Sequence, residues 1–549
     1  MDKIGKYIGV LSMLILNACG ISKSIHHLPL EIPMQQPVVS KISDTLVTHA
    51  NGFLVKNDKK IWELHVSGSA SERGMLTGAL AEPLVKKQER IFFSKVTEMV
   101  PSKTKQWLLR NILKWYNRKL HLNVTEEFKT EIYGLSLYTD TKYNYIAPPF
   151  LRSLYLHGAH DIGHVMQDLA LVGCTSLAVW GDKSADGELL IGRNLDFYAG
   201  DDFAQDKLIT FVKPDKGIPY ASVAWAGMIG VLSGMNKEGL TVTINASKSK
   251  MPLLAKTPIS LLTREILQYA STIEEAIAIA KKRPVFVSES IMIGSAKDKK
   301  GVIIEVSPKN FGVYEVPNTN QLLCTNHFQS KPYFSDKRNQ AHIRESHSQY
   351  RMERMQELLQ QQDKLNPEKM AGILRNKEGL KEAKIGYGNE KAINQLLAHH
   401  AVIFKPESRL MWVSSNPYQL GAFVAYDLNT VFDAKEPKLS EVTTLKMEAD
   451  DFIQSEAFKN YEIFRKLDRD MDNALGKKEN LSVDFITQYS QTNPNLWSVH
   501  FKLGKYWYTI KKYKEAAEAF QKAMQLEITT LPDRKEVEKY WHKTKKKLP

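Results

Sequence analysis

A short hairpin signal at residues 173–197, GCTSLAVWGDKSADGELLIGRNLDF, constrains the fold of this chain more than any other stretch. The alternating run at 176–180 predicts a strand, and the Asp186-Gly187 pair after it is a strong turn signal. Residues 189–192 then predict the returning strand. The pattern therefore predicts an antiparallel pair of strands with a cysteine at its start.

Three residues of this hairpin can carry chemistry: Cys174 on the first strand, and Arg193 and Asp196 on the second. The hairpin is expected to bring them within reach of one another. A cation beside a cysteine favours the thiolate, which is the nucleophilic form, and the carboxylate could hold an ammonium or orient a base. The hairpin alone also fits a small buried apolar cysteine with a surface ion pair, because free cysteine is among the most buried residue types.

The motif Gly-Cys-Thr-Ser, followed by Gly-Arg-Asn-Leu-Asp-Phe, resembles the cysteine N-terminal-nucleophile hydrolases of the acyl-CoA:6-aminopenicillanic acid acyltransferase type. Penicillin V acylases and bile salt hydrolases are more distant relatives of that family. The resemblance covers roughly residues 62–427 and implies an α+β fold, the αββα sandwich of two antiparallel sheets between helices. The order of strands, helices and strands along 174–430 agrees with such a sandwich.

The resemblance also implies self-processing at the bond between Gly173 and Cys174. Attack of the Cys174 sulfur on the Gly173 carbonyl gives a thioester that water resolves, so that Cys174 becomes an N-terminal residue. Its α-amine, with a reference pKa near ~8, then serves as general base. Gly173 suits the position because a residue without a side chain lets the thiol approach and tolerates a strained turn.

Four further places in the sequence match the family, and the first of them carries two residues. Arg193 and Asp196 are expected to position the thiolate, the α-amine and the substrate's polar group. Asn245 and Asn326 are expected to hold the oxyanion through their amide N–H groups, and Arg409 to support the site. From the residues alone, Asn245 also fits a turn asparagine and Arg409 a surface residue at a strand edge, and these alternatives stay open.

The first nineteen residues predict a targeting segment. A basic start precedes an apolar run at 8–16 that is too short to span a bilayer. The run ends in Leu-Asn-Ala-Cys, which resembles a bacterial lipoprotein signal in which Cys19 is acylated. We therefore expect a lipid-anchored protein of the cell envelope, on the outer membrane facing the periplasm. The alternative is an ordinary signal peptide with an incidental cysteine. Residues 20–44, with three prolines, predict a flexible tether.

The remaining chain divides into four predicted parts. Residues 45–173 form a pre-nucleophile segment, the small subunit after processing, and 174–430 form the hydrolase core. A linker at 431–450 leads to an all-α segment at 451–549. Apolar and small residues of that segment fall at the offsets of a tetratricopeptide helix pair. Such a tail is expected to offer a surface to a protein partner, or else to be a helical appendage packed on the enzyme.

Composition excludes several other classes. The net charge is +14, but lysine and arginine are scattered and no nucleic-acid motif is present. The three cysteines and the histidines show no metal-ligand spacing, and His399 and His400 fit packed or hydrogen-bonded residues. No cofactor or metal is expected.

The sequence thus predicts a self-processing cysteine amidohydrolase or acyltransferase. Its substrate is expected to be a small N-acyl amide, cleaved at a linear carbon–nitrogen bond through an S-acyl enzyme. Hydrolysis is favoured over transfer, since acyl-CoA is not expected outside the cytoplasm. Two alternatives stay open. One is an inactive lipoprotein that binds partners through its tail, and the other is an uncleaved hydrolase with His160 or His327 as the base.

Overall fold

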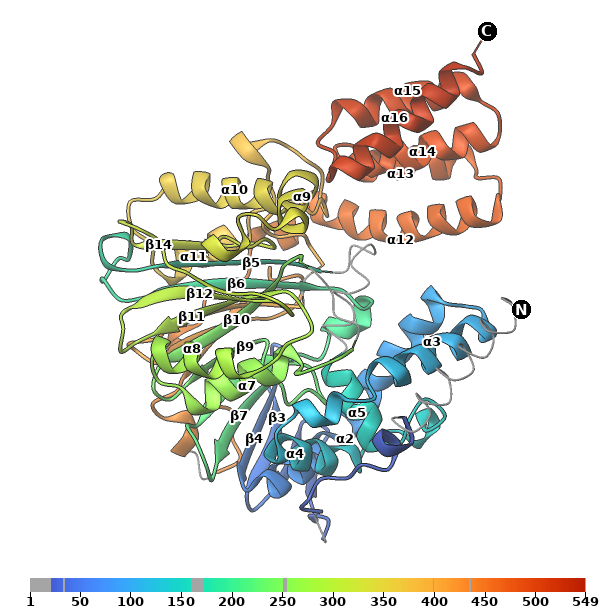
Figure 1. Ribbon diagram of the computed structural model, residues 1–549. Helices are drawn as coiled ribbons and strands as arrows, with labels where there is room; N and C mark the ends of the chain where they lie inside the picture. The colour runs from blue at the N-terminus through green and yellow to red at the C-terminus, as the bar shows by residue number, and fades with distance from the viewer. Residues whose placement is uncertain are drawn as a thin grey trace, which may run out of the picture.

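The computed structural model describes residues 21–32, 35–158, 172–249, 254–397, 399–433 and 436–548. Two β-sheets lie face to face between two layers of helices (Figure 1). Three hydrophobic clusters fill the three interfaces between these layers. The predicted αββα sandwich is confirmed. Cys19 and the helix expected at 161–169 lie outside the described residues.

The smaller sheet carries the predicted hairpin. Its strand order is β14-β5-β6-β15-β16-β17, and all its pairs are antiparallel. Helices α9 (Lys337–Glu345), α10 (Ser348–Gln360) and α11 (Pro367–Leu374) cover its outer face (Figure 1). The strands are β5 (Val172–Val179), β6 (Leu190–Phe197), β14 (Gln321–Cys324), β15 (His400–Lys405), β16 (Leu410–Ser414) and β17 (Phe423–Asp427).

The larger sheet has eleven strands in the order β1-β2-β3-β4-β7-β8-β9-β10-β11-β12-β13. Strands β2 to β4 come from the pre-nucleophile segment, so that segment and the core share one sheet. Strand β1 lies within residues 20–44, which were predicted as a flexible tether. The strands are β1 (Ser40–Ser43), β2 (Leu46–His49), β3 (Gly52–Lys56), β4 (Trp62–Gly68), β7 (Leu208–Pro214), β8 (Tyr220–Ala224), β9 (Ser233–Asn236), β10 (Leu240–Ala246), β11 (Glu289–Ser295), β12 (Lys300–Val306) and β13 (Phe311–Tyr314).

Two details of this sheet differ from the expectation. Strands β4 and β7 are parallel, because the chain passes through helices and the smaller-sheet hairpin before it returns, and parallel neighbours need such a crossover. Residues 231–232 are apolar and fit a strand, but β9 begins at Ser233. The Ser260 carbonyl, from the start of helix α7 (Ile259–Tyr269), accepts the Val231 N–H at 2.8 Å instead of a strand partner.

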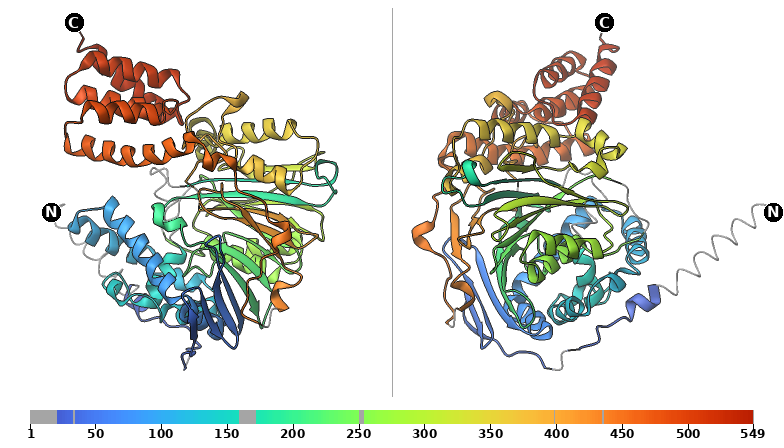
Figure 2. Two further views of the ribbon diagram at one scale, coloured as in Figure 1. Left: turned by 180° about the vertical axis from the view of Figure 1, so that it is seen from behind. Right: turned by 60° about the vertical axis from the view of Figure 1, so that its left-hand side comes forward.

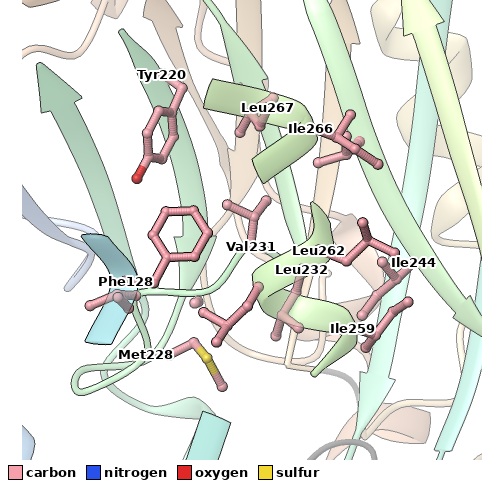
Figure 3. Packing of buried hydrophobic residues seen from close by; sticks show 14 of the residues in the cluster. Phe128, Tyr220, Met228, Val231, Leu232, Ile244, Ile259, Leu262, Ile266 and Leu267 are labelled. Carbon is pink, nitrogen blue, oxygen red and sulfur yellow. The ribbon is translucent and has the colours of Figure 1, made fainter. Parts of the chain in front are cut away.

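Helices α7 (Ile259–Tyr269) and α8 (Ile273–Lys282) cover the outer face of this sheet (Figure 1). Figure 3 shows Ile259, Leu262 and Ile266 of α7 packed towards Ile244 of β10 and towards the segment before β9. These apolar residues recur at the helical spacing of three to four, which is why this face of α7 is buried.

The helices of the pre-nucleophile segment pack closely on one another. They are α2 (Ala70–Met99), α3 (Lys103–Tyr116), α4 (Glu126–Ser136) and α5 (Pro149–His157). Ser69 and Glu72 cap α2 reciprocally. A Cβ atom at Gly74 would lie 2.1 Å from the Glu131 carbonyl oxygen of α4, so the glycines of α2 serve close helix packing.

Five C-terminal helices form a separate stack at one end of the sandwich (Figures 1 and 2). They are α12 (Glu456–Lys477), α13 (Val483–Thr492), α14 (Trp497–Thr509), α15 (Tyr513–Gln525) and α16 (Leu531–Lys545). Their apolar cluster includes Leu396 and Leu420 of the core, so the stack is packed on the enzyme. Across the residues placed here, every helix is too short or too polar to cross a membrane.

Candidate active site

Cys174 is fully buried within β5 and faces a guanidinium. The Nη2 atom of Arg193, on the neighbouring strand, lies 3.7 Å from the Cys174 sulfur. Burial raises the pKa of this thiol, while the positive charge of Arg193 opposes the shift. Arg193 is held by two more contacts, to Ser233 Oγ at 2.5 Å and to the Ile244 carbonyl at 2.6 Å. The cation is therefore fixed at the one group that a nucleophilic mechanism would ionise.

The register of the hairpin divides the predicted residues between two faces. Cys174 pairs with Leu195, Ser176 with Arg193, and Gly173 with Asp196. Because successive side chains of a strand alternate, Cys174 and Arg193 face the larger sheet, whereas Asp196 faces the helices. The Asp196 carboxylate lies close enough to the Cys174 thiol to help raise its pKa, but the two side chains leave the sheet on opposite sides.

Asp196 nevertheless lies at the site, beside the bond that precedes Cys174. Burial raises the pKa of its carboxyl to about 7, although Arg351, Gln419 and Arg193 favour the charged form. Neither carboxylate oxygen has a hydrogen-bond partner of good geometry among the described residues. The group is suited to receive a cation that the uncleaved chain does not yet have, such as a new α-amine.

The main chain of Cys174 is held by two residues from other elements. Its N–H donates to Asn326 Oδ1 at 3.0 Å, and its carbonyl accepts from Arg351 Nη1 at 2.7 Å. Arg351 comes from α10, is fully buried, and also donates to Asn326 Oδ1 at 2.5 Å. The sequence analysis missed Arg351, since it lies on an amphipathic helix 177 residues from the cysteine with no local signal.

The two predicted oxyanion residues both lie near β5, with one N–H of each amide already engaged. Asn245 Nδ2 donates to the Cys324 carbonyl at 3.2 Å, and its Oδ1 accepts from Ser176 at 2.7 Å. Asn326 Nδ2 donates to the Ala246 carbonyl at 2.8 Å. An amide nitrogen has two donors, so each side chain retains one for a ligand.

Arg409 is not brought to this group of residues. It sits in the turn between β15 and β16 at a φ of 61°. Its guanidinium donates to the carbonyls of Lys237, Pro406 and Glu407 at 2.5–2.9 Å. These contacts hold a turn, and a role for Arg409 at the active site stays a prediction.

His399 and His400 extend the network behind Arg193. His400 Nε2 lies 2.9 Å from Ser233 Oγ, and the two Nδ1 atoms of the histidines are 2.8 Å apart. Burial lowers the pKa of His399 to about 3 and that of His400 well below its usual value, so both rings are neutral. With Arg193 donating to Ser233, the hydroxyl can donate to His400, which assigns His400 the Nδ1–H tautomer.

His327, one base of the uncleaved alternative, does not serve as a base in this arrangement. His327 Nδ1 lies 2.8 Å from Ser348 Oγ, and burial lowers its pKa to about 4. Its contacts within the described part of the chain do not include Cys174. His160 falls outside the described residues.

Gly173 lies in a regular strand, and its φ is not in the left-handed region. The expected strained turn is therefore wrong as the reason for glycine. A Cβ atom here would lie 2.6 Å from Gln395 Nε2, so the Gln395 amide would have to move to admit a side chain. Gln395 had no signal in the sequence.

Comparisons with known proteins find similarity over part of the chain. The model of the acyl-coenzyme A:6-aminopenicillanic acid acyl-transferase family matches residues 183–417. An uncharacterized protein of Archaeoglobus fulgidus is 25% identical over 293 residues, covering 50% of this chain and 48% of that protein. The N-acylethanolamine-hydrolyzing acid amidase of Caenorhabditis elegans is 24% identical over 218 residues, covering 37% and 59%. The chain spans about half the length of the curated relatives it matches.

Two solved structures are also similar. One is an ortholog of N-acylethanolamine-hydrolyzing acid amidase from C. elegans, with 20% identity, a TM-score of 0.32, and coverage of 43% of this chain and 93% of that chain. The other is a mutant of the conjugated bile acid hydrolase of Clostridium perfringens, with 14% identity, a TM-score of 0.30, and coverage of 48% and 95%. Residues 183–417 of the chain are thus similar to the acyl-coenzyme A:6-aminopenicillanic acid acyl-transferase family.

Proposed function

We propose that this protein cleaves its own Gly173–Cys174 bond and then hydrolyses N-acyl amides through an S-acyl intermediate on Cys174. The observation that carries the proposal is the buried contact of 3.7 Å between the Arg193 guanidinium and the Cys174 sulfur, directly after a glycine. A cation at a buried thiol offsets part of the burial cost of the thiolate. The names of the relatives, amide hydrolases and an acyl-transferase, support the reaction class.

Self-cleavage converts the uncleaved site into a complete one. The amide nitrogen of Cys174 is not basic, but cleavage turns it into an α-amine with a reference pKa near ~8. That amine starts within reach of Asn326 Oδ1, which already accepts the Cys174 N–H at 3.0 Å. It can take the thiol proton for attack on the substrate and return it to the leaving amine.

An apolar pocket next to the site favours a substrate with an extended apolar acyl group. The cavity of about 210 Å³ lies between α2, α3 and the residues that follow β6. Phe197, the neighbour of Asp196 in the chain, lines it together with Phe92, Phe93, Leu109 and Leu113. We propose that the acyl chain occupies this pocket and that water, not an amine, accepts the acyl group.

The location of the protein is part of the proposal and rests on sequence alone. Acylation of Cys19 would anchor the chain on the outer membrane facing the periplasm, with residues 20–44 as the tether. Mass analysis of the membrane fraction tests this step, because a Cys19→Ser variant would lose the lipid and leave the membrane.

Intact mass and N-terminal sequencing of purified protein test the self-cleavage. The wild type should give a larger fragment that begins Cys-Thr-Ser, and Cys174→Ala should stay whole. Cys324→Ser is the matched control, since Cys324 is equally buried but its sulfur contacts the Thr325 carbonyl. A wild-type chain that stays whole but hydrolyses N-acyl amides would favour the uncleaved alternative. One that stays whole and inert would favour the partner-binding alternative.

A further inference from the structure

Gln395 packs against the glycine of the proposed cleavage site. The position that a Cβ of Gly173 would occupy is 2.6 Å from Gln395 Nε2 and 3.0 Å from its Oε1. The side chain is 2% exposed. Its amide therefore lies in direct contact with the residue whose carbonyl is attacked.

The nitrogen of this amide is a donor without an acceptor. Gln395 Nε2 is buried and has no hydrogen-bond partner among the described residues. Burying an amide N–H without an acceptor costs roughly 1–3 kcal/mol of folding free energy. Such groups are rare in folded proteins, so this one needs a structural or functional reason. By contrast, Asn245 and Asn326 each spend one N–H on a main-chain carbonyl. Gln395 thus retains both of its N–H donors, whereas each of the two asparagines retains one.

The faces of the strand show where an oxyanion on Gly173 would form. Cys174 projects towards the larger sheet and the Cβ direction of Gly173 towards the helices. The thiol therefore approaches the Gly173 carbonyl from the larger-sheet side. When the sulfur adds, the carbon becomes tetrahedral and its oxygen bends away from the sulfur, towards the face that Gln395 occupies.

We propose that Gln395 donates a hydrogen bond to the oxyanion that forms on Gly173 during self-cleavage. This inference rests on the proposed self-cleavage. In that step the Cys174 sulfur bonds to the Gly173 carbonyl carbon, the Gly173–Cys174 C–N bond breaks, and the thiol proton passes to the leaving nitrogen. Water then hydrolyses the thioester to the Gly173 carboxylate and the free thiol.

The C-terminal helices hold Gln395 in place. The segment at 383–397 has neither helix nor strand, so the regular main-chain hydrogen bonds of such elements do not fix its conformation. Leu396, the next residue, has a φ of 52°, a strained value for a leucine. Tyr461 of α12 donates its hydroxyl to the Leu396 carbonyl at 3.0 Å, and the Leu396 side chain is buried in the cluster of the tail.

Further hydrogen bonds join the segment at 383–397 to the C-terminal helical stack. Asn493 accepts from the Tyr387 N–H at 3.1 Å and donates to the Tyr387 carbonyl at 2.7 Å. Asn389 donates to the Glu527 carbonyl at 2.9 Å. A strained residue persists only where its surroundings over-determine it. The helical tail is thus part of the processing unit, as the support that sets the Gln395 amide.

Cleavage kinetics of freshly synthesised full-length chains test the role of Gln395. Gln395→Leu should slow the appearance of the Cys174 N-terminus by about 100-fold, the usual effect of losing one oxyanion donor. The pH dependence of cleavage in Gln395→Glu distinguishes hydrogen-bond donation from a purely structural role. A carboxylate cannot donate but a carboxylic acid can, so its rate relative to wild type should rise as the pH falls from 8 to 5, and the Leu variant's should not.

Two tyrosine substitutions test whether the C-terminal helices hold Gln395 in place. Tyr461→Phe should slow cleavage several-fold, because it releases the Leu396 carbonyl and keeps the ring. Tyr489→Phe is the control: this ring is buried in the same cluster, but its hydroxyl donates to Asp468 within the tail at 2.7 Å. It should cleave at the wild-type rate.

The possible results distinguish a failure of the Gln395 inference from a failure of the proposed self-cleavage. If the wild type does not cleave, the proposed self-processing is wrong. If the wild type cleaves and Gln395→Leu matches it, Gln395 is not a donor and only the inference is overturned. Equal slowing of the Leu and Glu variants at every pH assigns Gln395 a packing role and also overturns it. Melting temperatures in a Cys174→Ala background confirm that the variants fold.

Discussion

Arg351 and Cys174 share one acceptor: both the Arg351 guanidinium, at 2.5 Å, and the Cys174 N–H, at 3.0 Å, donate to Asn326 Oδ1. Arg351 also binds the Cys174 carbonyl at 2.7 Å. One fully buried cation thus holds the nucleophile's main chain on one face of β5, while Arg193 holds its sulfur on the other. The site is built around two cations with different tasks.

Removal of Arg351 should impair self-cleavage. Arg351→Met leaves the Cys174 carbonyl and Asn326 Oδ1 without a charged donor, so the scissile bond loses its orientation. A fall of about 10- to 100-fold in the cleavage rate is expected, in the range of lost charge-assisted hydrogen bonds of 1.5–3 kcal/mol. Arg354→Met is the control, since Arg354 lies one turn further on α10 and pairs with Glu357 and Glu382. Mass spectrometry of the time course measures both.

Loss of the Ser233 hydroxyl should shift the pH profile of the amidase reaction. Ser233→Ala removes the hydroxyl that accepts from Arg193 Nη1 and leaves only the contact of 3.4 Å between that atom and His400 Nε2. The guanidinium is then held less firmly at the sulfur, so it stabilises the thiolate less and the thiol pKa rises. The acidic limb of kcat/KM should therefore move to higher pH. Ser222→Ala, on the neighbouring strand β8, should leave the profile unchanged. An unshifted limb in Ser233→Ala would show that the histidines have no influence on the thiol.

Asp196 should make the uncleaved fold less stable as the pH rises. Its pKa is raised to about 7 in the fold, against an unfolded value near ~3.9. Between these values the folded chain holds more protons than the unfolded chain, so the free energy of unfolding falls with increasing pH. In a Cys174→Ala background, Asp196→Asn should flatten this fall between pH 4 and 8, as measured by urea denaturation. Parallel curves for the two proteins would refute the assignment.

Glu131 should be a main determinant of stability in the pre-nucleophile segment. It is 2% exposed and bridges Arg73 at 2.8 Å and Arg264 of α7 at 3.0 Å. Glu131→Gln leaves the buried Arg264 without its counter-charge and Arg73 with only the partly exposed Glu127, and it should cost roughly 3–5 kcal/mol. Glu265→Gln, which breaks a more exposed pair with Arg283, should cost about 1 kcal/mol or less. Equal effects of the two substitutions would contradict this account.

Filling the apolar pocket should change acyl-chain preference. Leu113→Trp adds bulk to the lining of the pocket, so kcat/KM should shift towards short-chain N-acyl amides by about 10-fold or more, since a methylene is worth 1–3 kcal/mol. Ile112→Trp is the control, because Ile112 of the same helix is 51% exposed and does not line the pocket. A chain-length series of substrates measures both, and an unchanged preference in Leu113→Trp would place the acyl group elsewhere.

Local patterns in the sequence sufficed for much of the architecture. Alternation and the Asp186-Gly187 turn predicted the β5–β6 hairpin, and helical periodicity predicted α7, α8 and α11. These features depend on residues that are close in the chain, so local sequence patterns can predict them. The resemblance to a family also named Cys174, Arg193, Asn245 and Asn326, which the fold brings together.

Only the tertiary structure decided how the site is assembled. The register put Asp196 on the face opposite the Cys174 side chain, and the fold put the Gln395 amide against Gly173, which lies in a regular strand and not in a strained turn. Arg351, Gln395 and Ser233 lie 59 to 221 residues away from Cys174 in the chain. Packing and strand register decide which side chains meet at the site, and neither can be recognised from the residues that are adjacent to those side chains in the sequence.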